Sequence, residues 1–241
     1  MGHLEVCGRS DTGKRRSINE DNLLTIEIGE FYLLAVADGL GGHAAGEVAS
    51  KIAVIEIGEF LKRNLAEQGP LDAFKGAIEK ANREIYLLSR ENQAYAGMGS
   101  TVVAALVQGH EALIANVGDS RAYLVDGGIE QVTRDHSLVQ ELVDKGIIKR
   151  EEAIRHPQRH VVTRTLGTQD VVAPDFREAN LEGKTLLLCS DGLTDSLKEE
   201  EIRDTVLGSA ELDRGCINLI DLANQKGASD NISVILARVR I

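Results

Sequence analysis

The chain has 241 residues, of which 43% are hydrophobic and only 3% aromatic, so a large but mainly aliphatic core is expected. Its net charge is −11, and the acidic residues are spread along the chain. Nucleic acids and anionic membranes attract basic surfaces, so this charge argues against both. We therefore expect no nucleic acid and no membrane among its partners.

Cysteine usage and hydropathy bear on the cellular compartment. Cys7, Cys189 and Cys216 show no CxxC spacing, which favours three reduced and mostly buried thiols. No basic segment followed by an apolar one opens the sequence, and no apolar run is long enough to span a bilayer. We expect a soluble, cytoplasmic protein that is monomeric.

Hydrophobic periodicity predicts strands at the start of the chain and then two helices. Residues 4–36 contain the strand patterns LEVCG, NLLTIEI and FYLLAVA, and a turn at Gly29-Glu30 joins the last two. Residues 45–66 and 71–92 instead carry apolar residues at helical spacing. Gly69-Pro70 separates them, which predicts two antiparallel helices.

The middle of the chain returns to strand patterns, with four of them between residues 100 and 133. Turns at Gly109-His110 and Asp126-Gly127-Gly128 predict that these strands form an antiparallel meander. The later elements are predicted to be a helix at 137–145, an irregular polar stretch at 146–170, a short acidic helix with a capping box of Ser196 and Glu199, a helix at about 210–225, and the closing strand NISVILARVRI.

The order of these elements favours the α+β class. Strands and helices are segregated rather than alternating, which indicates antiparallel sheets and not a doubly wound parallel sheet. The closing strand needs a partner far back in the sequence. One closed domain over residues 1–241 explains that better than two separate domains.

Acidic residues lie at the ends of several apolar strands. Asp38 and Asp191 each follow an apolar run and precede a glycine, whose backbone can approach a ligand and offer its carbonyl. Other acids at strand–loop junctions are Glu20 and Asp21 before the second strand, Asp119 between two strands, and Asp230 before the closing strand. If these strand ends meet, the carboxylates converge on one rim of the molecule.

Such a cluster cannot stay ionised without compensation, because neighbouring carboxylates raise each other's pKa. Either several are protonated or cations lie among them. Oxygen ligands without a His/Cys cluster point to Mg²⁺ or Mn²⁺, and two such ions can clamp phosphoryl oxygens and activate water. The simpler interpretation makes each Asp-Gly an ordinary turn, as we expect at Asp126, but the repetition of the pattern favours a site.

Eight segments occur in an order typical of one family: SDTGKRRSINEDN, VADGLGGHAAGEVAS, MGSTVVAAL, ANVGDSRAYLV, TRDHS, TRTLG, LLLCSDGLTD and ASDNISVIL. From Arg9 to Val239 the chain resembles the metal-dependent protein phosphatases of the 2C type, and most of all their compact bacterial serine/threonine members. The resemblance implies a four-layer α/β/β/α sandwich with metals at one edge. It also implies hydrolysis of phosphoserine and phosphothreonine in proteins by a metal-activated water, and a serine/threonine kinase among the phosphorylated partners.

Residue by residue, the resemblance implies that Asp38 bridges two Mn²⁺ or Mg²⁺ ions. Asp191 and Asp230 would complete one ion, while the Gly39 carbonyl and water would complete the other. Further metal residues implied in this way are Glu20 and Asp21, directly or through water, and Asp119 and Asp195, which match a third and weaker ion in relatives. Arg16 matches the phosphate-binding arginine, whose planar fork suits two phosphate oxygens.

The chain departs from the animal relatives at the presumed general acid. In those relatives a histidine follows the Asp-Gly pair directly, whereas here Leu40 follows it and His43 comes later. Either His43 is the acid, or it orders the Gly41-Gly42 loop while a metal-bound water donates the proton. His136 is expected to be a structural hydrogen-bonding residue.

Residues 146–170 correspond to the variable flap of the family. The basic residues of this segment, with Arg155 and Arg159 among them, predict a contact with the phosphoprotein; the alternative is a merely solvated loop. Two rival functions remain. One is a non-catalytic binding module, which the presence of the core acids and of Arg16 disfavours, and the other is an enzyme for sugar or nucleotide phosphates.

Overall fold

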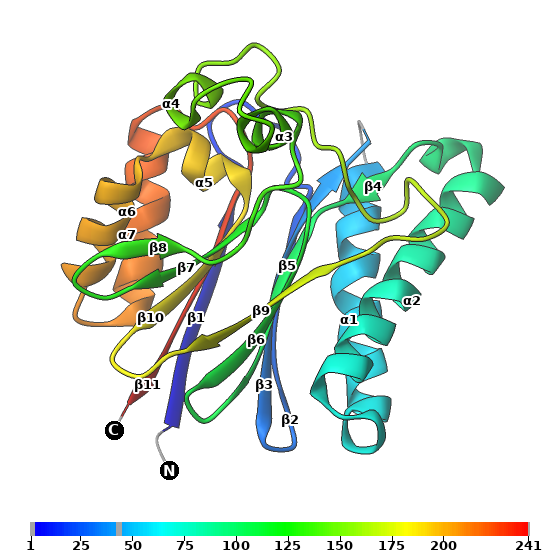
Figure 1. The fold of residues 1–241 in the computed structure, drawn as a ribbon, viewed down its shortest axis with the longest axis horizontal. Helices are drawn as coiled ribbons and strands as arrows, with labels where there is room; N and C mark the ends of the chain where they lie inside the picture. The colour runs from blue at the N-terminus through cyan, green and yellow to red at the C-terminus, as the bar shows by residue number, and fades with distance from the viewer. Residues whose placement is uncertain (1–2, 42–44, 241) are drawn as a thin grey trace.

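The computed structural model describes residues 3–41 and 45–240. Two sheets of antiparallel strands stack face to face in the middle of the molecule, and helices cover both outer faces (Figure 1). One sheet has the order β1 (His3–Asp11), β11 (Ile232–Arg240), β10 (Thr185–Cys189), β7 (Arg121–Val125) and β8 (Ile129–Gln131). The other has the order β2 (Asp21–Ile28), β3 (Phe31–Leu40), β5 (Val102–Gln108), β6 (Glu111–Val117) and β9 (Asp175–Asn180), with the short β4 (Gly99–Ser100) paired to the end of β3.

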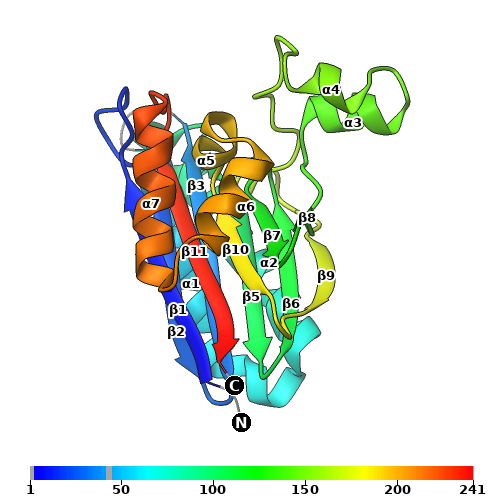
Figure 2. The ribbon, with the colours of Figure 1, turned by 90° about the vertical axis from the view of Figure 1, so that its left-hand side faces the viewer.

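The helices form the outer two layers, so the predicted four-layer sandwich of the α+β class is confirmed. Long α1 (Ala45–Gln68) and α2 (Pro70–Glu91) pack together on the sheet that contains β3, and α6 (Glu199–Leu207) and α7 (Leu212–Gln225) cover the other sheet. The remaining helical turns are η1 (Gln93–Tyr95), α3 (Leu138–Asp144), α4 (Arg150–Ala153) and α5 (Asp191–Ser196). Figure 2 shows α3 and α4 projecting beyond one end of the sandwich.

The central strands have continuous apolar runs because both of their faces are buried. In β3, Leu33 and Ala35 belong to the core under α1 and α2, whereas Leu34 and Val36 belong to the core between the sheets. The sequence pattern LLAVA, which lacks the alternation of a half-exposed strand, follows from this position. Among the helices of the described residues, none is long and apolar enough to cross a bilayer.

The predicted meander over residues 100–133 is wrong. β5 and β6 form one hairpin and β7 and β8 another, but the hairpins lie in different sheets. The chain crosses between the sheets at Gly118, which has φ 113° and where an added Cβ would lie 2.6 Å from Thr101 Cγ2. Turn residues identify a hairpin but not the sheet it joins, so the sequence pattern could not locate the crossing.

Two further local predictions fail. Strand β9 was not predicted, because its sequence DFREAN is mostly polar, as an edge strand permits. The capping box of Ser196 and Glu199 is also wrong, since Ser196 is the last residue of α5. Helix α6 begins two residues later than that motif requires, and Glu201 Oε2 accepts the Lys198 backbone N–H at 3.1 Å.

Candidate active site

Asp21 and Asp38 are direct cross-strand partners in the β2–β3 ladder. Neighbours of this kind have Cβ atoms roughly 5 Å apart, so the two carboxyl groups share one small space. Asp38 lies within β3 rather than in the loop after it, because the strand continues to Leu40 through its pairing with β4. The pattern of an apolar strand followed by Asp-Gly therefore locates the acid correctly and the strand end two residues too early.

Hydrogen bonds connect this pair to the opposite sheet. Ser190, which precedes Asp191, donates its hydroxyl to Asp21 Oδ2 at 2.8 Å and accepts the Ser233 N–H at 2.9 Å. The Thr101 N–H donates to the Asp38 carbonyl at 2.8 Å. The Thr101 hydroxyl also lies 2.7 Å from that of Ser120, the neighbour of Asp119. Asp191 and Asp119 are thus brought to the same rim as Asp21 and Asp38.

Asn231 holds the loop after β1 in the same way. Its side-chain oxygen accepts the Glu20 N–H at 2.8 Å, and its amide donates to the carbonyls of Thr12 and Ile18 at 2.9 and 3.0 Å. Because Asn231 follows Asp230, one short segment places Asp230 and also fixes the loop that carries Arg16. Neither Ser190 nor Asn231 was predicted from the sequence, and their position next to an acid in the motifs CSDGL and SDN was the available signal.

The glycines after Asp38 and Asp191 allow a close approach of backbone to backbone. A Cβ on Gly39 would overlap the Gly46 carbonyl oxygen, and a Cβ on Gly192 would overlap that of Asn231. Both contacts are far shorter than any real side chain tolerates, so only glycine lets these segments meet. In both cases the close partner is another segment of the rim.

Burial raises the pKa values of these acids. It raises the pKa of Asp21 to about 6 and, together with the charge of Asp135, raises that of Asp119 to about 6. The pKa values of Asp38 and Asp191 are raised well above the ordinary range, first by burial and then by neighbouring carboxylates. The charges that act on Asp38 are, in decreasing order, those of Asp21, Asp191, Asp119 and Asp230.

The arrangement fits divalent cations. Buried oxygens without a hydrogen-bond partner include Glu20 Oε1, Asp21 Oδ1 and Asp191 Oδ1. Mutually repelling carboxylates with unpaired oxygens are the donor set that hard cations such as Mg²⁺ and Mn²⁺ prefer. Within the described residues, the one group of three or more side chains whose ligand atoms all lie within 4.8 Å of one another is His160, Asp191 and Asp195. His160 was not among the predicted metal residues, and no spacing in the sequence connects it to Asp195.

Arg16 supplies positive charge at the rim. Its Nη2 donates to Asp230 Oδ2 at 2.7 Å, and its Nη1 lies 3.8 Å from Glu20 Oε2. About half of its side chain is exposed, so guanidinium N–H groups remain accessible from outside. Arg16 therefore brings an accessible positive charge to the buried carboxylates.

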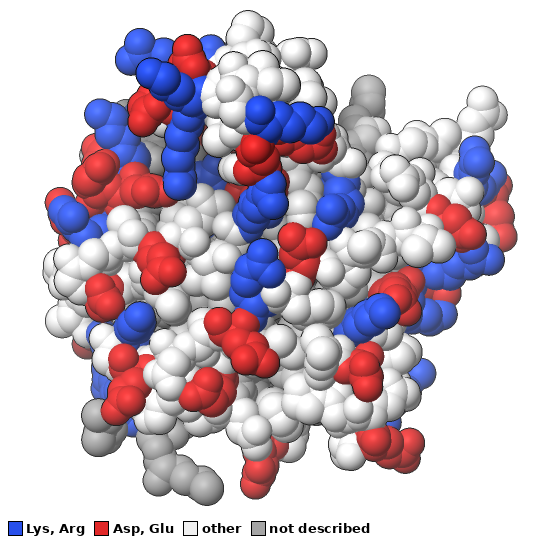
Figure 3. Space-filling model, viewed as in Figure 1, with Lys and Arg blue, Asp and Glu red and all other residues white. Residues whose placement is uncertain are grey.

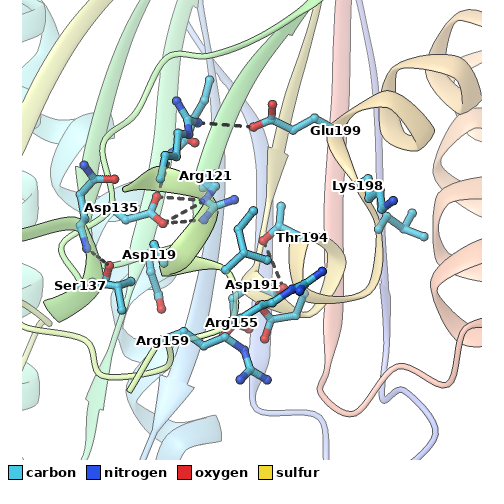
Figure 4. A pocket seen from close by; sticks show the side chains of 18 of the residues that line it. Asp119, Arg121, Asp135, Ser137, Arg155, Arg159, Asp191, Thr194, Lys198 and Glu199 are labelled. Carbon is cyan, nitrogen blue, oxygen red and sulfur yellow. Dashed lines mark hydrogen bonds and ion pairs between the residues drawn. The ribbon is translucent and has the colours of Figure 1, made fainter. Parts of the chain in front are cut away.

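A cavity of about 1130 Å³ opens beside the rim (Figure 4). Its lining includes Asp119, Asp191 and Asp195 from the rim and Arg155 and Arg159 from the stretch 146–170. His160 Nδ1 lies 3.2 Å from Asp195 Oδ2, which connects this stretch to the rim. Figure 3 shows basic side chains near α4 with acidic ones beside them, and charges of both signs are interspersed over that face.

His43 and His136 were both singled out from the sequence, and the structure describes only the second of them. His43 lies outside the described residues. His136 is buried, accepts the Gly118 N–H at 3.0 Å through Nδ1, and lies 3.4 Å from Asp175 Oδ2 through Nε2. Burial and the charge of Arg164 lower the pKa of His136. These contacts agree with the structural role expected for His136, since they hold the segment that leads into Asp119.

Two face-to-face antiparallel sheets with a rim of buried carboxylates and one arginine define a metal-dependent phosphoryl hydrolase. Known proteins specify the family. The family model for protein phosphatase 2C matches residues 7–236, and the chain belongs to the protein phosphatase 2C family.

Individual relatives are similar over most of their length. A protein from Streptococcus pyogenes named putative protein phosphatase 2C-type is 39% identical over 239 residues, which cover 97% of this chain and 96% of the relative. Serine/threonine phosphatase stp from Listeria monocytogenes is 39% identical over 234 residues, covering 95% and 93%.

Solved structures agree with these matches. The serine/threonine phosphatase Stp1 from Staphylococcus aureus superposes with a TM-score of 0.93 at 40% identity, covering 99% of this chain and 96% of that one. The catalytic domain of the serine threonine protein phosphatase PstP, in complex with two manganese ions, superposes with a TM-score of 0.86 at 36% identity and covers 99% of both chains.

Proposed function

We propose that this chain, a protein serine/threonine phosphatase of the 2C family, hydrolyses phosphoserine and phosphothreonine at the carboxylate rim, with water as the attacking group. The observation that supports the location most is the set of buried acids with raised pKa values beside the exposed face of Arg16. A phosphate monoester needs positive charge on its oxygens and an activated water, and this rim provides the ligands for both.

Two Mn²⁺ or Mg²⁺ ions are the proposed cofactors. Asp38 would be shared between them, with Asp191 and Asp230 on one ion and the Gly39 carbonyl on the other. Glu20 and Asp21 would act directly or through water. When bound, the ions supply Lewis acidity, which polarises phosphoryl oxygens and makes water more acidic.

A third cation is proposed at the edge of the cavity. Motif similarity assigns it to Asp119 and Asp195, whereas distance favours Asp195 together with His160 and Asp191. Asp119 is not in the group with mutual distances below 4.8 Å, and neither are Asp38 and Asp230, whose assignment to the first two ions rests on the motif similarity. We therefore propose Asp195 as the common ligand and His160 as the ligand contributed by the flap.

The remaining catalytic roles belong to Arg16 and His43. Arg16 would bind two phosphate oxygens with its fork of N–H groups and keep them oriented as charge builds up on them. The serine or threonine alkoxide is a poor leaving group and needs a proton, which His43 or a water would donate.

Residues 1–241 would act as one phosphatase domain, with the flap at about 146–170 forming one wall of the substrate cavity. Arg155 and Arg159 line that cavity and would contact the phosphoprotein. We further propose a cytoplasmic signalling enzyme, acting as a monomer, with a serine/threonine kinase among its substrates.

The deciding experiment measures hydrolysis of phosphoserine and phosphothreonine peptides with Mn²⁺, with a chelator, and in Asp38→Ala. We expect activity only in the wild type with metal. Asp126→Ala is the matched control, because Asp126 also precedes a glycine but contacts the Gly128 N–H of its own turn and Lys184, and it follows β7 at the end opposite to Asp119. Full activity in chelator or in Asp38→Ala would overturn the mechanism.

Substrate class needs a separate comparison, since the rim binds the phosphoryl group and not what carries it. Turnover of phosphopeptides should exceed that of sugar and nucleotide phosphates under the same conditions. Preference for a sugar or nucleotide ester would reject the protein substrate while leaving the metal mechanism standing. Tight phosphopeptide binding without turnover would instead indicate a binding module.

A further inference from the structure

We propose that Cys7 and Cys216 form a dithiol pair that a hydroperoxide converts into an intramolecular disulfide between β1 and α7. All three cysteines are free thiols, and the metal-dependent chemistry proposed above uses none of them. Cys7 and Cys216 are 209 positions apart in the sequence, so no spacing pattern could pair them.

The packing of α7 on the sheet brings the two thiols together. In the ladder between β1 and β11, Cys7 is the partner of Leu236. Gly215 of α7 lies over that same Leu236, since a Cβ on Gly215 would be 2.8 Å from Leu236 Cδ1. The missing side chain lets this turn of α7 approach the sheet closely. Cys216, the next residue, thereby points its thiol to within 3.4 Å of the Cys7 carbonyl oxygen, and each thiol contributes to the pKa shift of the other.

Only one of the two thiols is accessible. Cys7 is partly exposed, and its thiol donates to Asp213 Oδ1 at 3.4 Å, whereas Cys216 is fully buried. Arg9 donates to the same Asp213 oxygen at 2.6 Å and so brings a positive charge near Cys7. Burial raises the pKa of both thiols, which predicts a slow reaction at neutral pH that accelerates in mild alkali.

The reaction is balanced with a hydroperoxide as the oxidant. The Cys7 thiolate attacks the peroxide, its S–O bond forms as the O–O bond breaks, and a sulfenic acid and an alcohol, or water, result. Cys216 then attacks the Cys7 sulfur, and the S–S bond forms while the hydroxyl leaves as water with the proton of the Cys216 thiol. Two thiols and one hydroperoxide thus give one disulfide, one water and one alcohol.

The disulfide would link the edge strand β1 covalently to α7 and stabilise the folded protein. Strand β1 lies at the edge of its sheet and has β11 as its ladder partner there. A disulfide to α7 joins it to the helix layer as well and closes a long loop of chain, which restricts the unfolded ensemble. The oxidised protein should therefore melt roughly 5–10 °C higher than the reduced protein.

The test treats the metal-loaded full chain with hydrogen peroxide at mildly alkaline pH, then alkylates the remaining thiols in denaturant. Intact mass should show the loss of two hydrogen atoms, and digestion should give one peptide pair joining Cys7 to Cys216 that a phosphine reductant separates. Cys189→Ser is the matched control and should form the same linkage, because Cys189 is buried elsewhere in β10.

The single variants make the pairing falsifiable. In Cys216→Ser the sulfenic acid at Cys7 has no resolving partner, so Cys7 should proceed to sulfinic acid instead. In Cys7→Ser the buried Cys216 should remain alkylatable after peroxide. Sulfinic acid at Cys7 of the wild type, a dimer linked through Cys7, or two unreacted thiols under conditions that oxidise Cys216→Ser would each overturn the proposal.

Discussion

The guanidinium of Arg16 lies 2.7 Å from the carboxylate of Asp230, although the two residues are 214 positions apart in the chain. Asn231 explains this proximity, because its amide holds the loop before Glu20 through two backbone carbonyls. The contact places the positive charge of the rim beside a proposed metal ligand. A phosphate at this position could contact Arg16 without a large movement of the loop.

Two substitutions of Arg16 should distinguish the contribution of its positive charge to kcat/KM from that of its bidentate hydrogen bonding. In Arg16→Lys we expect kcat/KM on phosphopeptides to fall about 10-fold, and in Arg16→Ala about 100-fold, because an ammonium keeps the charge but loses the bidentate fork. Arg15→Ala is the matched control, since Arg15 is an exposed neighbour. Steady-state kinetics with Mn²⁺ give kcat/KM for the three variants and the wild type. Equal activity of Arg16→Lys and wild type would show that the fork is not used.

The buried acids predict how the stability of the metal-free protein depends on pH. The pKa of Asp21 and that of Asp119 are raised to about 6, from an unfolded value of about 3.9. The folded state therefore binds more protons than the unfolded state in this range, so stability falls as pH rises from about 4 to about 6. Asp38 and Asp191, with still higher pKa values, extend the loss to higher pH.

Thermal melts in chelator should consequently give a lower Tm at pH 8 than at pH 5.5, and Mn²⁺ should remove or reverse this difference. In chelator, Asp38→Asn should raise the Tm and flatten the pH dependence, because one buried charge is gone. His136, whose pKa is lowered, acts in the opposite sense and costs stability only below about pH 6.5. A chelated wild type that becomes more stable towards pH 8 would contradict the predicted carboxylate repulsion.

His160 is predicted to contribute to the third cation site. Calorimetric titration with Mn²⁺ should show the weakest site lost, or its affinity reduced roughly 10- to 100-fold, in His160→Ala. The control is His156→Asn, a second flap histidine whose side chain accepts only the Gln158 N–H, a bond that Asn can reproduce. Unchanged metal stoichiometry and affinity in His160→Ala would leave the third site to Asp119 and Asp195.

The flap arginines are predicted to bind the protein part of the substrate. Arg155→Glu and Arg159→Glu should raise KM several-fold for phosphopeptides, since the phosphorylated segment must enter the cavity that both residues line. A small aryl phosphate reaches only the rim, and its KM should stay the same. Arg203→Glu on α6 provides a charge-matched control outside the cavity. If KM stays unchanged for both substrates, the stretch is merely solvated.

Local pattern was enough for most elements of the fold. The hairpin of β2 and β3, the two long helices and the closing strand all follow from apolar periodicity and from Gly or Pro at the breaks, because these signals act within a few residues. The failures share one cause. Strand β9, the division of residues 100–133 between two sheets and the start of α6 are decided by contacts with distant segments.

The candidate site divides along the same line. The sequence by itself determined which acids lie near the ends of apolar strands and that Arg16 precedes Glu20 by four residues, since covalent neighbours and residue types are local properties. Only the tertiary structure decided that Ser190 bonds to Asp21, that His160 reaches Asp195 and that Cys216 meets Cys7. Those contacts depend on how two sheets and their helices stack, and the stacking free energy is spread over the whole core rather than encoded beside any one residue.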